Sequence, residues 1–265
     1  MSVTNLVKME KAHINIAHIN VRSLTVINNL GRRIVRIKQF LINDCDCDVI
    51  ACTETHLDST VEDHEVEIEG YQLIRKDRNR KGGGVGIYVR DNIHFVRIYE
   101  LESPDAETIW IEIKQNNSAL LFGVCYRPPG QLVGEVEAFL SSLEQTLYLA
   151  QQKNLTKLVL MGDFNDPCLK WDSIHCRSEL KNDLLNLTLA FNLKQLVLEP
   201  TTDLNLLDLI FTNSTDLISE VKVLNPIHDL DHCPVFAKIL FRVNKKNPKY
   251  ILERYGTMNM EILLI

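Results

Sequence analysis

The chain has 265 residues, of which 45% are hydrophobic and 24% charged, and its formal net charge is −6. This composition is typical of a globular protein and excludes a disordered, collagen-like or membrane-embedded chain. Seven cysteines, an odd number, argue against a disulfide framework. Because Met1 to Lys11 has no apolar core behind its charges, we expect no secretory signal, and hence a nuclear or cytoplasmic protein that is not secreted and binds no membrane.

Short apolar runs alternate with helical patterns along the first half of the chain. Residues 13–19 and 48–53 predict strands, and residues 32–42 predict an amphipathic helix. Further strands are expected at residues 71–75, 85–89, 94–99, 108–113 and 119–126, separated by turn-rich stretches. The glycine-rich stretch Gly82–Gly86 lacks a following lysine and helix, so we expect a turn into a strand and not a phosphate-binding loop.

The second half of the chain continues the pattern. Its predicted elements are helices at 134–152 and 178–191, and strands at 157–161, 207–212 and 234–240. Two packed sheets with helices outside would explain strands that are apolar at nearly every position. We expect one domain over residues 12–243, an N-terminal extension over 1–11 and a basic tail over 244–265.

Basic residues gather in three stretches despite the negative net charge. Arg22–Lys38 carries five basic and no acidic residues, Arg75–Arg97 seven and two, and Arg242–Arg254 five and one. The segment Asp44–Glu69 instead carries ten acidic residues and no basic one. Each basic stretch taken alone is equally consistent with a solvated face, but several in one chain indicate a polyanionic partner.

Polar residues follow, interrupt or directly precede six of the predicted strands. They are Asn20, Glu54, Tyr126-Arg127, Asp163-Phe164-Asn165, Asp208 and Asp231-His232. Any one of them alone is most simply a turn former or a helix cap. Together on one rim they supply what phosphodiester hydrolysis needs: oxygen ligands for Mg²⁺, a histidine beside an aspartate, and a hydroxyl and a guanidinium for the phosphate oxygens.

Seven blocks of sequence stand in the order found in the endonuclease/exonuclease/phosphatase superfamily. They are Ile19–Leu24, Thr53–Leu57, Gly82–Tyr88, Tyr126–Pro129, Gly162–Asn165, Leu207–Asn213 and Asp231–Val235. Within the superfamily they most resemble the endonuclease domain of LINE-type (non-LTR) retrotransposons, over residues 12–242. The resemblance implies an α+β fold, a four-layered αββα sandwich of the DNase I type, with the active site on the rim of the two sheets.

The resemblance also implies a metal site and a position for the attacking water. Glu54 would be the principal ligand of Mg²⁺, for which Mn²⁺ is a possible substitute, with Asn20 beside it and Asp231 near the metal. Asp163 would orient or deprotonate the water, and Asn165 would help to place it.

Phosphate and DNA contacts follow from the same resemblance and from the basic stretches. His232 would contact the scissile phosphate, aligned by Asp208, and Tyr126 would stabilise the pentacovalent phosphorus. The arginines expected to contact double-stranded DNA are Arg22, Arg75, Arg78, Arg80 and Arg127.

These residues predict a Mg²⁺-dependent endonuclease that nicks one DNA strand and leaves a 3′-hydroxyl. In related elements a reverse transcriptase follows the nuclease, and since its polymerase aspartates are absent from this sequence, we expect a module of a retrotransposon-derived or truncated element. Two alternatives stay open: a phosphatase or phospholipase of the same superfamily, and a catalytically idle remnant that only binds nucleic acid.

Overall fold

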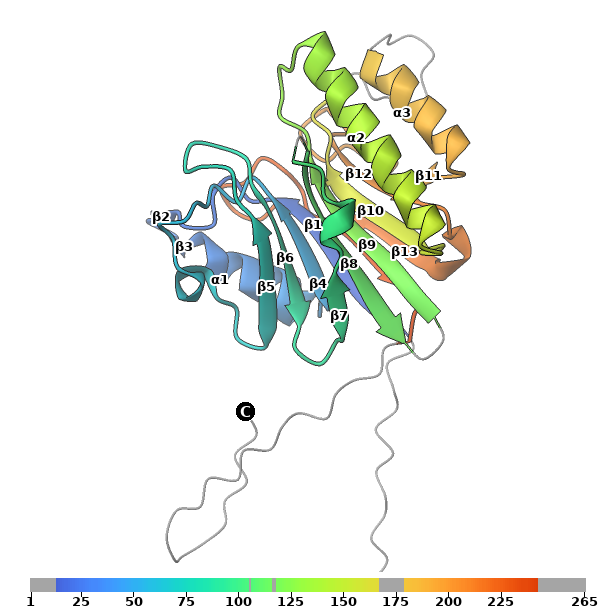
Figure 1. Ribbon diagram of the computed structural model, residues 1–265. Coiled ribbons are helices and arrows are strands. Elements are labelled where there is room, and N and C mark those ends of the chain that lie inside the picture. Colours follow the sequence, from blue (N-terminus) through green and yellow to red (C-terminus); the bar gives the residue numbers. More distant parts are fainter. Residues whose placement is uncertain (1–12, 105, 116–117, 167–178, 243–265) are drawn as a thin grey trace, which may run out of the picture.

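The computed structural model describes residues 13–104, 106–115, 118–166 and 179–242. They form two sheets that lie face to face, with helices on the two outer sides (Figure 1). The first sheet has the strand order β13-β14-β1-β4-β6-β5. Its strands are β1 Ile14–Asn20, β4 Val49–Thr53, β5 Tyr71–Lys76, β6 Val85–Arg90, β13 Ile218–Val223 and β14 Val235–Ile239.

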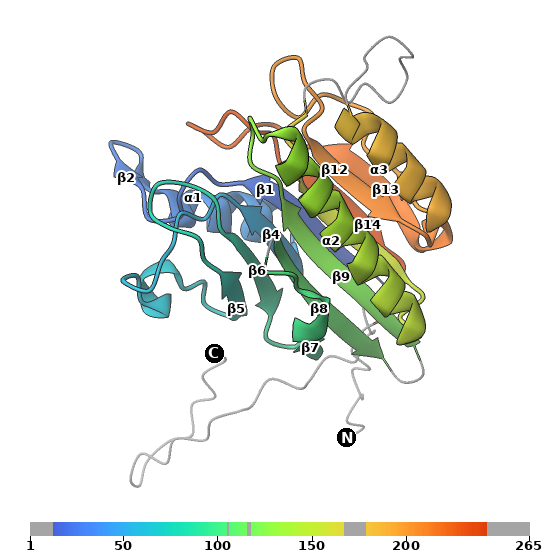
Figure 2. The same ribbon diagram turned by 45° about the horizontal axis from the view of Figure 1, so that its top comes forward.

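The second sheet has the strand order β11-β12-β10-β9-β8-β7. Its strands are β7 Phe95–Arg97, β8 Glu107–Gln115, β9 Ser118–Tyr126, β10 Leu158–Asp163, β11 Lys194–Gln195 and β12 Asp208–Thr212. Helices α2, Val133–Gln152, and α3, Glu179–Ala190, lie side by side on its outer face (Figure 2). Helix α1, Arg33–Ile37, covers the outer face of the first sheet. The predicted α+β sandwich of four layers is therefore confirmed.

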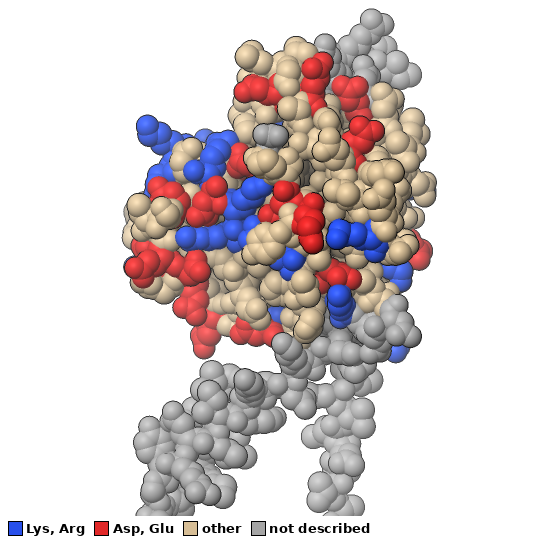
Figure 3. Space-filling model, viewed as in Figure 1, with Lys and Arg blue, Asp and Glu red and all other residues tan. Residues whose placement is uncertain are grey.

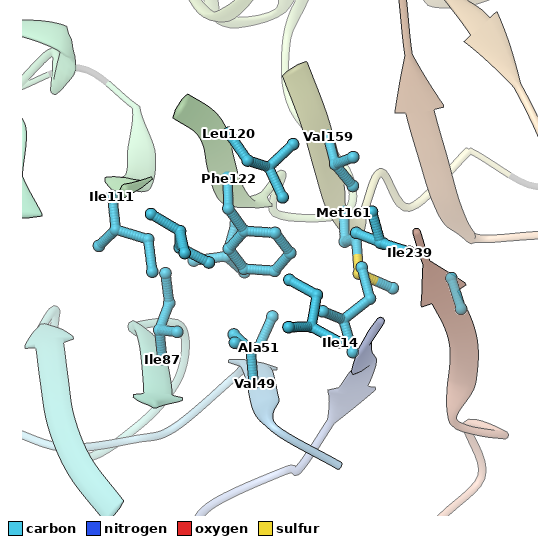
Figure 4. Packing of buried hydrophobic residues seen from close by; sticks show 14 of the residues in the cluster. Ile14, Val49, Ala51, Ile87, Ile111, Leu120, Phe122, Val159, Met161 and Ile239 are labelled. Carbon is cyan, nitrogen blue, oxygen red and sulfur yellow. The ribbon is translucent and has the colours of Figure 1, made fainter. Parts of the chain in front are cut away.

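Side chains of the central strands alternate between two kinds of packing. In β1, Ile14 and Ile16 belong to the layer between the sheets, whereas Ala17 and Ile19 belong to the cluster under α1. Figure 4 shows side chains of both sheets meeting in this inter-sheet layer, among them Phe122 from β9. Since both faces of these strands are covered, the strands are apolar at nearly every position.

Several elements differ from the predictions. The helix predicted over residues 32–42 is α-helical only as far as Ile37 and continues in π-helical turns over Lys38–Asp44. Not predicted were the edge strands β11 and β13, a short hairpin of β2 (Ile27–Asn28) with β3 (Gly31–Arg32), and the 3₁₀ turns at 63–66, 99–101 and 215–217. The turn predicted at Gly82–Gly86 is confirmed, since β6 begins at Val85.

The remaining expectations concern the ends of the chain, the thiols and the membrane. The extension over 1–11 and the tail over 244–265 lie outside the described residues. Five cysteines lie within the described residues, and all of them are free thiols: Cys45, Cys47, Cys52, Cys125 and Cys233. No helix of the described segments is long and apolar enough to cross a bilayer.

Candidate active site

The inter-sheet layer becomes polar at one end of the central strands. Asn20 ends β1, Asp163 ends β10 and Tyr126 ends β9, each on the face that is apolar earlier in its strand. Asp208 begins β12, which runs in the opposite direction, and lies directly opposite Asp163 in the sheet register. Tyr126 is the register partner of Asp163 on the other side. Strand pairing therefore brings residues distant in sequence to one rim.

Glu54, Asn20 and Asp163 form a chain of hydrogen bonds from one sheet to the other. The Asn20 amide Nδ2 donates to Glu54 Oε1 and to Asp163 Oδ2, both at 2.9 Å. Asn165 Nδ2 donates to the same Asp163 oxygen at 3.0 Å, and the Tyr126 hydroxyl donates to Glu54 Oε1 at 3.1 Å. Five residues predicted from four strand ends are thus joined in one network.

The charge balance of this network is negative. Burial, and then the negative charge of Asp208, raise the pKa of Asp163 to about 8, although His232 and the hydrogen bonds from Asn20 and Asn165 act in the opposite direction. Burial and the Glu54 carboxylate also raise the pKa of Tyr126, whose hydroxyl therefore keeps its proton. Carboxylates crowded in this way bind a cation readily, because a cation favours their ionised form.

Asp208 and His232 form a second, buried pair beside the network. His232 Nδ1 lies 2.8 Å from Asp208 Oδ2, and both side chains are almost fully buried. Burial lowers the pKa of His232, but the charge and hydrogen bond of Asp208, with further charges on Asp163 and Asp231, raise it to about 9. The imidazole is therefore protonated at neutral pH, and Nδ1 donates to Asp208.

Asp231, the third predicted metal ligand, lies on the exposed side of the rim. Arg22 Nη1 donates to Asp231 Oδ2 at 2.7 Å, and both side chains are 55% exposed. A different compact set consists of Asp163, Asp208 and His232, whose ligand atoms lie within 4.8 Å of one another and could hold a metal ion. The rim therefore offers a candidate ligand set that was not predicted and that shares no residue with the predicted set of Asn20, Glu54 and Asp231.

The loops that carry these residues are in left-handed backbone conformations. The φ angles are 40° at Arg22, 53° at Glu54, 52° at His56 and 48° at Asn165. Such conformations cost on the order of 1–3 kcal/mol each for residues other than glycine, and persist only where surrounding contacts impose them. Their concentration at one rim supports the choice of this rim as the candidate functional site.

Arg33 supplies many of these contacts. Its guanidinium is almost fully buried and donates to the carbonyl oxygen of Val21 at 2.9 Å, to that of Arg22, and to Asp229 Oδ2 at 2.9 Å. The Val21 segment carries Asn20, and the Asp229 segment leads to Asp231 and His232. One side chain thereby ties together two loops of the site.

Arg127 serves the same purpose on the other side. It is buried, and it donates from Nε to the Phe164 carbonyl at 2.6 Å and from Nη2 to the Asn165 carbonyl at 2.7 Å. Asn165 Nδ2 returns a bond to the Arg127 carbonyl at 3.0 Å. The guanidinium of Arg127 therefore donates to the backbone of the segment that carries Asn165.

The three arginines predicted to contact DNA near the end of β5 and in the loop before β6 lie in different surroundings. Arg75 Nη2 donates to the Val61 carbonyl at 2.8 Å, and its guanidinium is also paired with Asp63 and Asp77. Arg78 pairs with Glu107 at 2.7 Å and lies 5.8 Å from the centre of the Tyr126 ring, and Arg80 is exposed. Figure 3 shows Lys and Arg side chains gathered at the upper left of this face, above acidic ones.

Three residues at the rim had not been assigned a role from the sequence. His56 Nε2 lies 3.2 Å from Glu54 Oε2, His18 lies 3.3 Å from Asp208, and Arg33 anchors the loops. His56 could have been noted from the sequence, because it stands in the same block as Glu54. His18 could also have been noted, as a polar residue inside an apolar strand. Arg33 is one of several basic residues in its stretch, and nothing in the sequence distinguishes it from the others.

The Asp208–His232 pair predicts a pH-dependent stability. Because the folded pKa of His232, about 9, lies above its ordinary value of 6.5, the pair stabilises the fold fully below pH 6.5 and loses this contribution as the pH rises through 9. The contribution is on the order of 3 kcal/mol. Urea unfolding of the protein and of His232→Gln should therefore give a difference in free energy that shrinks between these pH values. A difference independent of pH would mean that His232 is not charged in the fold.

Comparisons with known proteins agree with this geometry. Residues 120–236 match the family described as "Endonuclease-reverse transcriptase", whereas no curated protein sequence matches the chain. The endonuclease domain of TRAS1, a telomere-specific non-LTR retrotransposon, superposes with a TM-score of 0.66 at 14% identity, over 85% of this chain and 98% of that domain.

Two other solved structures share the fold. The 3′ phosphatase NExo from Neisseria, bound to a product DNA hairpin, gives a TM-score of 0.64 at 21% identity, over 85% of this chain and 99% of that one. The human Nocturnin catalytic domain with a bound sulfate anion gives 0.56 at 15% identity, over 85% and 92%. The resemblance to the endonuclease/exonuclease/phosphatase superfamily is therefore confirmed, and the fold is one shared by nucleases and phosphatases.

Proposed function

We propose that the chain is a metal-dependent endonuclease that nicks one strand of duplex DNA by phosphodiester hydrolysis and leaves a 3′-hydroxyl. The observation that carries the proposal is the hydrogen-bonded network of Glu54, Asn20 and Asp163 beside the charged His232. Carboxylate and amide oxygens next to a buried imidazolium suit a cation and a phosphate at the same rim. The family match at residues 120–236 supports an endonuclease among the activities that this fold serves.

Glu54 and Asn20 would hold Mg²⁺, or Mn²⁺ in its place, with Asp231 near it. When bound, the cation neutralises the charge that develops on the phosphorus oxygens. We favour this set over Asp163, Asp208 and His232, because His232 Nδ1 is already engaged by Asp208 Oδ2 at 2.8 Å.

Asp163 would accept a proton from the water that attacks phosphorus once its carboxyl group is ionised, a form that a cation bound nearby would favour against the raised pKa. Its Oδ2 is held by the amides of Asn20 and Asn165, and its Oδ1 accepts the backbone N–H of Asn165 at 3.0 Å. These bonds fix the carboxylate before the reaction begins, which lowers the cost of orienting the water. We assign Arg127 to holding the Asn165 segment in place, in addition to the DNA contact expected from its sequence position.

His232 and Tyr126 would act on the phosphate. The imidazolium offers its remaining N–H, at Nε2, to a non-bridging oxygen, while the protonated Tyr126 hydroxyl offers a second donor. As the water oxygen bonds to phosphorus, the bond from phosphorus to the 3′ oxygen breaks, and that oxygen takes a proton to become the 3′-hydroxyl. Charge-assisted donors placed in advance stabilise the extra negative charge of the transition state.

A nicking assay tests the proposal directly. Supercoiled plasmid incubated with the purified protein and Mg²⁺ should become open-circular, and EDTA should prevent the conversion. A polymerase should then extend the nicks without prior end repair, because each carries a 3′-hydroxyl. Absence of nicking with either Mg²⁺ or Mn²⁺, while duplex DNA is still bound, would favour the idle remnant. Release of phosphate from a 3′-phosphate end without nicking would favour the phosphatase.

DNA affinity should depend on salt through Arg78 and Arg80, with Arg22 contributing near the site. Replacing Arg78 and Arg80 by glutamine should weaken binding to unrelated duplexes alike and lower the slope of log K against log[salt] by about 1 to 2. Arg75→Gln is the matched control, because the Arg75 side chain is 19% exposed and paired with two carboxylates, Asp63 and Asp77, whereas that of Arg78 is 36% exposed and paired with one, Glu107. Fluorescence anisotropy of labelled duplexes in EDTA would measure both quantities, and an equal effect of all three arginines would contradict this division.

A further inference from the structure

His18 is a polar residue at a position where the strand pattern calls for an apolar one. It follows Ile14 and Ile16 on the inter-sheet face of β1 and is 0% exposed. Asn20, two residues further on this face, contacts Asp163 in the second sheet. A buried polar side chain is retained at a cost unless its hydrogen bonds are made, so the partners of His18 indicate its purpose.

Each ring nitrogen of His18 faces one partner. Nδ1 lies 3.3 Å from Asp208 Oδ1, and Nε2 lies 3.2 Å from the Thr53 hydroxyl oxygen. An ionised carboxylate only accepts, so the proton of a neutral imidazole belongs on Nδ1, and Nε2 then accepts from the Thr53 hydroxyl. A second positive charge on His18 would face the imidazolium of His232 across the same carboxylate. The surroundings therefore favour neutral His18 in one tautomer.

Asp208 is consequently held between two imidazoles. Its Oδ1 faces His18 from the first sheet, and its Oδ2 accepts from His232. The 3.3 Å contact lacks hydrogen-bond geometry, and neither Asp208 Oδ1 nor His18 Nδ1 has a hydrogen-bond partner among the described residues. Without His18, the buried Oδ1 would lose this polar contact and would remain beside Asp163. The carboxylate would then rotate toward another donor, and His232 would lose its alignment, because one oxygen cannot move without the other.

We propose that His18 is a positioning residue of the active site, which holds the Asp208 carboxylate so that its second oxygen aligns His232 toward the phosphate. The inference rests on the proposed nuclease function for its kinetic consequence only. The contact between His18 and Asp208 links the two sheets and can be examined without any substrate.

A pair of substitutions separates positioning from packing. In His18→Asn the side-chain amide places an N–H close to the position of Nδ1, whereas His18→Leu fills a similar volume with no donor. We expect His18→Leu to lower kcat of nicking about tenfold with KM unchanged, and His18→Asn to restore it to within about threefold of the parent. Equal losses in both variants, with cooperative unfolding retained, would overturn the proposal.

A double-mutant cycle with Asp208 gives the second test. In an Asp208→Asn background His18→Leu should cost less than about twofold, because the carboxylate that His18 positions is already gone. Losses that multiply would show that His18 acts independently of Asp208.

A spectroscopic readout keeps the inference apart from the nuclease activity. Proton and nitrogen NMR of ring-labelled histidine should show the Nδ1–H of His232 protected from exchange in the parent and in His18→Asn, and rapidly exchanging in His18→Leu. If the parent protein fails to nick DNA but this difference is present, the proposed function fails and the positioning role stands. An unchanged His232 signal in His18→Leu overturns the positioning role whatever the activity.

Discussion

Glu54→Gln should lower the single-turnover rate of plasmid nicking by about 10² or more and leave the fold intact. The substitution removes one negative charge from the proposed cation site, where the stabilisation of transition-state charge is worth several kcal/mol. The glutamine retains an oxygen that can accept from Asn20 and Tyr126, so the packing of the rim is preserved. The rate should be measured at increasing Mg²⁺ concentrations, together with thermal unfolding.

Glu144→Gln provides the matched control, because Glu144 is an exposed residue of α2. It should leave the nicking rate unchanged. If Glu54→Gln retained full activity, the assignment of the cation to Glu54 would be wrong. The alternative set of Asp163, Asp208 and His232 would then be tested by Asp208→Asn, whose effect on the Mg²⁺ dependence distinguishes the two sets.

His232→Ala should lower the nicking rate by about 10² or more as well, for a different reason. The variant loses a positioned, charged donor to the phosphate, and it leaves the Asp208 carboxylate buried without its closest partner. Because this change also affects stability, the rate should be measured well below the unfolding temperature, and His94→Ala, an exposed histidine, is the control. A loss of less than about threefold would mean that the Asp208–His232 pair serves the fold alone.

Most of the fold could be predicted because its central strands are covered on both faces. The runs that became β1, β4, β9, β10, β12 and β14 are apolar at nearly every position, and turn residues separate them. The edge strand β13 was missed because none of its residues is fully buried and a register shift between Ile218 and Glu220 interrupts its period, with Ser219 and Lys222 exposed. The β2–β3 hairpin has only two residues in each strand, and its place depends on Asp229, nearly 200 residues away.

The site was predictable where chemistry and strand ends coincide. Asn20, Glu54 and Asp163 could be named because each polar residue stands at the end of an apolar run. The contacts that support these residues could not be predicted, because they depend on which strands are neighbours. Arg127, for example, contacts the Asn165 segment because β9 pairs with β10. The pairing of Arg22 with Asp231 likewise connects residues 209 positions apart. The sequence shows that such residues are charged but does not show which residues they contact.

The pairing of β1 with β14 also determines how this fold can be joined to other proteins. Ile14 at the start of β1 faces Ile239 at the end of β14, whereas Asn20 and His232 lie toward the opposite ends of the same two strands. The first and last strands of the fold thus begin and end together, about 20 Å along the strands from the rim. A short linker between the two ends would permit circular permutation. Fusion partners attached at either end would likewise be placed away from the rim that is proposed to face DNA.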